Sequence, residues 1–178
     1  MNAVIAVAHP DDCVIFAWPI VKCKFEWDWD IVYLTYNEDD PRAKEARAFW
    51  DRHNVPTTFL GFEDHYRDLE QKKITTFDEV YANFKMQTAL EYADVVVTHN
   101  PDGDYGHPHH ILVSNAVTAT GKPVIYFAGT DNFDLEITEQ PDFDTAQWPL
   151  HREVIEGFQD RHIGRYYVGE AREKGIDI

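Results

Sequence analysis

The sequence predicts an α/β fold of the Rossmann-like class, in which helices on both faces cover a mostly parallel sheet. Two observations predict it. Strand-like and helix-like segments alternate along the chain, and the strand-like segments include continuous apolar runs, Val4–Ala8 and Val95–Val97, typical of buried parallel strands. The chain has 178 residues, 44% of them hydrophobic, which is enough for a sizeable core. We therefore expect a single domain over residues 1–178.

Five elements are expected in the first half of the chain. Its strands are short runs rich in β-branched and aromatic residues. Pro41 lies where helices accept proline, in the first turn, and Ala46, Phe49 and Trp50 then share one face. In order, these elements are the strand Ala3–Ala8, the helix Asp12–Val21, the strand Ile31–Tyr36, the helix Pro41–His53 and the strand Thr57–Leu60.

Six more elements are expected in the second half. Thr76 or Asp78 begins the first helix as its N-cap, and Val80 and Phe84 lie near its apolar face. Gly121 ends the next helix. In order, these elements are the helix Thr76–Leu90, the strand Asp94–Thr98, the helix His107–Thr120, the strand Val124–Ala128, the edge strand Asp131–Ile137 and the helix Gln147–Arg161.

Charge and cysteine content exclude several classes of protein. The chain has 16 Lys and Arg against 32 Asp and Glu, a net charge of −16. Such a surface repels phosphate backbones and anionic membranes, so we expect no nucleic-acid partner. Two cysteines, Cys13 and Cys23, make no disulfide framework and indicate a reducing compartment. With no membrane-length apolar run and no cleavage signal, we expect a soluble, cytoplasmic protein; the sequence does not indicate its oligomeric state.

The first candidate site directly follows the first expected strand. Pro10 locks the turn and restricts His9 to extended geometry, and open α/β sheets bind ligands at this end of their strands. His9 and Asp12 can both point into a cleft there. An imidazole nitrogen and a carboxylate oxygen are good Zn²⁺ ligands. Taken alone, the segment fits equally well a strand-to-helix turn capped by Asp12.

The second candidate site lies about a hundred residues later, in Tyr105–His110, after another expected strand. His107 and His110 are three residues apart at a helix start, which places them on one face. One of them would complete a set of two imidazoles and one carboxylate, the pattern of a catalytic zinc with an open position. Asp11 could then take a proton from metal-bound water, and the other histidine could donate a proton or stabilise an oxyanion. The joint occurrence of the two segments favours a metal site over two unrelated turns.

Three motifs follow one another in the chain. Ala-His-Pro-Asp-Asp spans Ala8–Asp12, an Arg-x-x-Glu helix start runs from Arg42 to Glu45, and the loop Asn100–Gly103 leads to Gly106–His110. Their order and spacing resemble the PIG-L/LmbE family of zinc-dependent N-acetyl-sugar deacetylases. The resemblance covers roughly residues 1–128 and implies an LmbE-like fold.

The resemblance also implies an activity. Zinc-bound water would attack the amide carbonyl of a small N-acetylglucosamine-type sugar conjugate, with an aspartate as general base; Fe²⁺ is the other divalent metal considered. The implied roles are metal ligand for His9, Asp12 and His110, general base for Asp11, oxyanion or leaving-amine assistance for His107, carbonyl polarisation for Tyr105 and substrate binding for Arg42.

Two positions depart from the family pattern. Cys13 stands where the family has Glu, and His109 stands where it has Asp. Neither is a ligand or the base in this assignment, and both could orient the imidazoles. A catalytically altered binding module on the same fold is therefore one alternative. A non-haem Fe(II) oxygenase is another, because it also uses two His and one carboxylate. The remaining histidines are expected at surface or structural positions: His53, His65, His99, His151 and His162.

Overall fold

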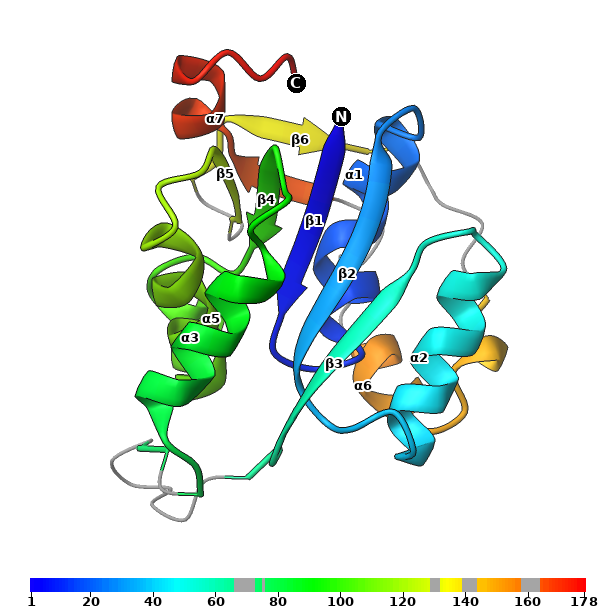
Figure 1. Cartoon of the computed structure of the whole chain (residues 1–178). Helices are drawn as coiled ribbons and strands as arrows, with labels where there is room; N and C mark the ends of the chain where they lie inside the picture. The colour runs from blue at the N-terminus through cyan, green and yellow to red at the C-terminus, as the bar shows by residue number, and fades with distance from the viewer. Residues whose placement is uncertain (66–72, 75, 129–131, 139–143, 158–163) are drawn as a thin grey trace.

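The computed structural model describes residues 1–65, 73, 74, 76–128, 132–138, 144–157 and 164–178. Within them, seven strands form one sheet in the order β3-β2-β1-β4-β5-β7-β6 (Figure 1). In chain order the strands are β1 (Asn2–Val7), β2 (Asp28–Thr35), β3 (Thr57–Phe62), β4 (Val95–Thr98), β5 (Val124–Phe127), β6 (Leu135–Ile137) and β7 (Gly164–Tyr167).

The sheet is parallel except at one edge. β1 lies between β2 and β4, with Ile5 opposite Ile31 on one side and Val97 on the other. β3 and β5 extend the parallel part outward, and β7 and β6 then pair antiparallel. The predicted Rossmann-like, mostly parallel sheet is confirmed. Because the strand order reverses between β1 and β4, a crevice is expected outside their carboxyl ends.

Helices cover both faces of the sheet (Figure 1). The expected helix Asp12–Val21 is seen as two consecutive segments, η1 and α1, the first of them a π-helix. None of the described helices is long and apolar enough to cross a membrane. The helical segments are η1 (Cys13–Ala17), α1 (Trp18–Cys23), α2 (Pro41–Asp51), α3 (Glu79–Ala89), α4 (Gly103–Gly106), α5 (Pro108–Thr118), the 3₁₀ segment η2 (Thr145–Gln147), α6 (Arg152–Gly157) and α7 (Gly169–Glu173).

The two faces of the sheet bury separate cores. Successive residues of β1 point to opposite faces, so Ile5 packs into the core that holds Trp50 of α2. Val4 packs instead into the core that holds Met86 of α3. All four side chains are fully buried, and each contributes on the order of 1.5–3 kcal/mol by leaving water. Because alternate residues of β1 enter cores on the two opposite faces, residues 3–7 of the strand are all buried, and their sequence is a continuous apolar run.

Helix α3 shows where the predicted apolar face was wrong. Asp78 is its N-cap, as one of the two expected options. Val80 is 78% and Phe84 62% exposed, however, while Ala82 and Met86 are fully buried. Apolar residues occur on both sides of this helix, so periodicity alone did not select the face that meets the sheet.

The C-terminal region departs furthest from prediction. Instead of a helix over Gln147–Arg161, the structure has a helix only at Arg152–Gly157, and residues 158–161 lie outside the described part. The expected edge strand is confirmed over Leu135–Ile137; residue 131 is not described. Strand β7 was not predicted. It has only four residues and runs antiparallel between β5 and β6, so neither its length nor its direction follows the pattern of the preceding chain.

Candidate metal centre

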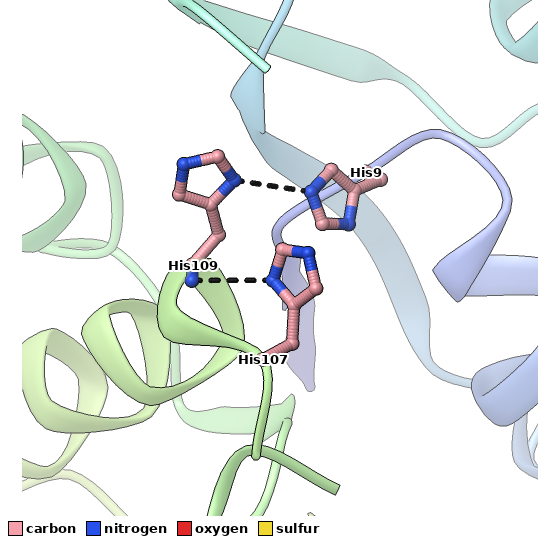
Figure 2. Close-up of side chains that lie close together, drawn as sticks. All are labelled: His9, His107 and His109. Carbon is pink, nitrogen blue, oxygen red and sulfur yellow. Dashed lines mark hydrogen bonds between the residues drawn. The ribbon is translucent and has the colours of Figure 1, made fainter. Parts of the chain in front are cut away.

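The two predicted segments come together at the carboxyl ends of β1 and β4. His9 and Asp12 lie in the turn after β1, and His110 lies in the first turn of α5, which follows β4. Figure 2 shows His9 facing the start of α5, opposite His107 and His109. Because parallel neighbouring strands end at the same edge of the sheet, side chains about a hundred residues apart share one site.

Three donor atoms converge in this site. Asp12 Oδ2 lies 3.1 Å from His9 Nδ1 and 3.3 Å from His110 Nε2, and the two nitrogens are 3.3 Å apart. Donors bound to one tetrahedral Zn²⁺ lie about 3.3 Å apart, because each bond is about 2.0–2.1 Å long. The side chains are enclosed: His9 is 9%, Asp12 3% and His110 0% exposed. The donor set therefore fits one divalent ion in both chemistry and spacing.

Asp104 orients the His110 ring from the other side. Its Oδ2 accepts a hydrogen bond from His110 Nδ1 at 2.8 Å and one from His99 Nδ1 at 2.5 Å. With its proton held at Nδ1, His110 presents the Nε2 lone pair to the site. The ring of His99 stacks on that of His110, with centroids 3.8 Å apart. His99, which was expected at a surface or structural position, is therefore part of the site.

The backbone around Asp104 is held in an unusual conformation. Asp104 has φ +63°, in the left-handed region that a residue with a side chain seldom adopts. Asn100 stabilises it, since its Oδ1 accepts hydrogen bonds from the backbone N–H groups of Asp102 and Asp104, each at 3.0 Å. Sequence reasoning missed Asp104; the Asn-Pro-Asp-Gly loop was its only signal.

Electrostatics favour a positive charge between the donors. Burial opposes protonation of His9, but Asp12 and Asp64 outweigh it and raise the pKa of His9 to about 10. Burial also opposes the charge on Asp12, yet His110 and His9 hold the pKa of that carboxyl well below its usual range. A divalent cation on neutral His9 would supply the same positive charge next to Asp12.

The comparisons with known proteins bear on this site. Residues 4–120 match the family model described as PIG-L, GlcNAc-PI de-N-acetylase. The chain belongs to the PIG-L family. The family expected from the motifs is thereby confirmed, and the matched range includes every candidate site residue. No match was found among curated proteins.

Solved structures share the PIG-L fold of this chain at low sequence identity. The 4-carboxy-2-hydroxymuconate hydratase GalB of Pseudomonas putida KT2440 is 15% identical, with a TM-score of 0.65, covering 90% of this chain and 83% of its own. The N,N'-diacetylchitobiose deacetylase of Pyrococcus horikoshii is 14% identical, with a TM-score of 0.62 and coverage of 98% and 86%. A zinc-inhibited form of teicoplanin deacetylase Orf2 is 13% identical, with a TM-score of 0.56 and coverage of 89% and 84%. At this identity the likenesses establish the fold.

Asp11 and His107 flank the three donors of this PIG-L chain. Burial, and then the charge of Asp12, raise the pKa of Asp11 to about 6. His107 caps α5, and its Nδ1 accepts a hydrogen bond from the His109 backbone N–H at 3.3 Å (Figure 2). Burial, and then the charge of His9, lower the pKa of His107 to about 3. His107 is therefore neutral, and in the matching tautomer its Nε2 carries a proton that it can donate.

A polar wall faces His9 from β2, α2 and β3. Arg42 Nη1 donates to Tyr36 Oη at 2.7 Å and lies 3.8 Å from Asp64 Oδ2, and the Tyr36 hydroxyl donates to the same carboxylate. Asp64 Oδ1 lies 3.1 Å from His9 Nε2. Arg42 is thus linked to the site through Asp64. Sequence reasoning missed Asp64, which follows β3 without any motif around it.

The remaining predicted residues lie at the border of the site. Tyr105 is 58% exposed, and its ring centroid is 5.2 Å from that of His110 and 5.8 Å from that of His107. Glu45, the last residue of the Arg-x-x-Glu motif, faces the C-terminal region instead. Its carboxylate accepts from His151 Nδ1 at 3.0 Å and from the Leu150 N–H at 3.0 Å.

The two departures from the family pattern have different surroundings. The Cys13 thiol donates to the Pro10 carbonyl at 3.0 Å, and its Sγ lies 2.9 Å from Tyr33 Oη and 3.0 Å from Trp50 Nε1. It supports the turn that carries His9. His109, in contrast, enters the site directly, because its Nδ1 lies 3.2 Å from His9 Nε2 (Figure 2).

Proposed function

We propose that this PIG-L family protein is a divalent-metal-dependent amide hydrolase. It removes the acetyl group from a small, N-acetylglucosamine-type sugar conjugate and releases acetate and a free amine. One observation carries the proposal: His9 Nδ1, Asp12 Oδ2 and His110 Nε2 lie 3.1–3.3 Å from one another, next to Asp11. The family match supports the deacetylase reaction, since the fold alone serves more than one reaction and cannot decide it.

In this proposal, His9, Asp12 and His110 hold one ion, with Zn²⁺ preferred and Fe²⁺ as the other candidate. When bound, a divalent ion lowers the pKa of water and polarises a carbonyl oxygen, which is the chemistry that amide hydrolysis requires. Asp104 fixes the His110 ring by accepting its Nδ1 proton at 2.8 Å. Loss of His9, Asp12 or His110 is expected to impair metal binding, and activity would be lost as a consequence.

Asp11 acts as the general base. Asp11 precedes Asp12 in the turn after β1, and the charges of Asp12 and His9 act on its carboxyl, so it lies near the donors without being one of them. It takes a proton from the attacking water and passes it to the departing amine, as one group does in many hydrolases. Asp12 remains ionised between two imidazoles and is unsuited to proton transfer.

His107 and Tyr105 stabilise the reacting carbonyl. His107 is neutral, and with Nδ1 occupied by the His109 N–H, its Nε2–H donates to the oxygen as negative charge develops. Tyr105, half exposed at the open side, adds a hydroxyl donor. Arg42 binds polar groups of the sugar from the opposite wall, where Tyr36 and Asp64 orient its guanidinium.

The test is an assay of amine release. Protein stripped of metal and reloaded with one equivalent of Zn²⁺ or Fe²⁺ is incubated with a panel of N-acetylglucosamine conjugates, and free amine and acetate are quantified. We expect both products in equal amounts, only with metal present. Oxidised products that require Fe²⁺ and oxygen would support the oxygenase alternative instead. Ligand binding without turnover across the panel would support the binding module.

A further inference from the structure

His9 presents a second nitrogen to a second group of donors. Its Nε2 lies 3.1 Å from Asp64 Oδ1 and 3.2 Å from His109 Nδ1, and those two atoms are 3.7 Å apart. These spacings are close to the spacing of about 3.3 Å between donors of one tetrahedral ion. The two spacings to His9 Nε2 fall within the 3.1–3.3 Å range of the first donor set, which uses Nδ1 of the same ring, and the third is longer.

The second set is fixed by the core but is more open than the first. His9 follows β1, Asp64 follows β3 and His109 lies in α5, so three elements of the core fix the donors. His109 is fully buried, whereas the Asp64 side chain is 27% exposed and leaves the set accessible from solvent. His107 adds an imidazole nearby, since one ring nitrogen each of His9, His107 and His109 lie within 4.8 Å of one another (Figure 2).

We propose that the chain binds a second divalent transition-metal ion, with Zn²⁺ as the preferred one, through His9 Nε2, Asp64 Oδ1 and His109 Nδ1. This inference rests on the proposed function, because the first ion occupies the other nitrogen of His9. With both nitrogens bound, His9 is an imidazolate and its two ring protons are released to solvent. The family motif has Asp at position 109, so the imidazole donor there belongs to this sequence.

The second ion opposes catalysis. It offsets the negative charge of Asp64, whose other oxygen, Oδ2, holds Arg42 and Tyr36, and it lies beside His107, whose Nε2–H is needed by the reacting carbonyl. Activity should therefore rise with the first equivalent of Zn²⁺ and fall at least several-fold as the second is taken up. The two ions are coupled through one ring, so the second binds more weakly than the first.

The experiment measures metal stoichiometry. Metal-free wild-type protein is dialysed against a series of Zn²⁺ concentrations and analysed for bound zinc, alongside His109→Leu and Asp64→Asn. His53→Leu is the matched control, because His53 is exposed and lies far from the site. We expect two ions per chain for wild type and His53→Leu. We expect one ion for His109→Leu and Asp64→Asn, with the second affinity weakened by about 100-fold or more.

The outcomes separate the two proposals. One ion per wild-type chain at all Zn²⁺ concentrations would overturn the second site and leave the proposed function standing. No bound ion would overturn both. Two ions in His109→Leu and Asp64→Asn would show that the assigned ligands are wrong. Circular dichroism checks that each variant folds, and Asp64→Asn, at a partly exposed position, keeps the test valid if His109→Leu does not fold.

Discussion

Two buried histidine–carboxylate pairs near the carboxyl edge of the sheet differ in what surrounds them. His9 lies 3.1 Å from Asp12, and His151 lies 3.0 Å from Glu45, so the contacts themselves are alike. His110 and His99 also approach Asp12, and the pKa of His9 is raised to about 10. Glu45 instead accepts a hydrogen bond from the backbone N–H of Leu150. A histidine–carboxylate contact alone does not indicate a metal site; convergence of further donors does.

Removing the carboxylate should affect metal binding in the first pair and folding stability in the second. Asp12→Ala should lose metal and activity together, because the donor shared by both imidazoles is gone. Glu45→Ala should keep one ion at the first site but lower the free energy of unfolding by about 1–3 kcal/mol, since His151 and Leu150 lose their acceptor. Zinc analysis and urea unfolding measure the two effects. Full metal retention in Asp12→Ala would break the comparison.

Substitutions of Asp11 and Asp12, which are adjacent in the turn after β1, should also have different effects. Asp11→Asn keeps the size of the side chain but loses its basic oxygen. We expect it to bind metal normally and to lower kcat by a factor on the order of 10² or more. Asp12→Asn, the matched variant, should weaken metal binding. If Asp11→Asn instead lost the metal, the roles of the two carboxylates would be interchanged.

His107 should give a smaller effect. His107→Ala removes a neutral donor but none of the three proposed ligands of the first ion, so metal content should stay unchanged at one equivalent of Zn²⁺. We expect kcat to fall by a factor of about 10–100, with little change in KM, because the lost contact forms mainly in the transition state. His107→Gln, which retains an N–H donor, should recover part of the rate. A rise in KM alone would argue against this role.

The smallest expected effect is the pH dependence of folding stability that arises from His151, the histidine paired with Glu45. Burial, and then the charge of Arg42, lower the pKa of His151 from 6.5 to about 4. The unfolded chain therefore takes up a proton below about pH 6.5 that folded His151 does not accept until about pH 4. The contribution of His151 to the free energy of unfolding is therefore complete above pH 6.5 and declines as the pH falls toward 4.

Comparison with His151→Gln isolates this contribution from that of the other histidines. Unfolding free energies of both proteins are measured in urea at pH 7.5 and 4.5 with chelator present. The advantage of the wild type over the variant should shrink at the lower pH. An advantage that stayed constant would mean that His151 does not titrate on unfolding.

The sequence predicted the part of the site that local motifs carry. His9, Asp12 and His110 could be brought together on paper because parallel strands end at the same edge of the sheet, and the structure does bring them together. Asp64 could not be found, since it reaches His9 from β3, two strands away from β1, and no pattern marks it. Asp104 was hidden by a backbone conformation that sequence does not reveal.

The same distinction holds for the fold. The alternating order of elements predicted the parallel sheet, because each strand is followed by a helix that returns the chain. The buried face of α3 was predicted wrongly, since Val80 and Phe84 satisfy the periodicity as well as Ala82 and Met86 do. Only packing against the sheet distinguishes the two faces. Strand β7 was missed for a related reason, because its partners are set by the tertiary structure.

The environment of Cys13 has a consequence for labelling chemistry. Only the thiolate form of cysteine attacks electrophiles, and burial raises the pKa of the Cys13 thiol, which also contacts Tyr33 and Trp50. Cys23 is exposed at the end of α1, near the amino ends of the strands. A maleimide dye should therefore attach at Cys23 alone. The protein therefore offers a single labelling position without any mutation. This position is remote from His9, Asp12 and His110, so the dye signal can follow unfolding without disturbing the metal centre.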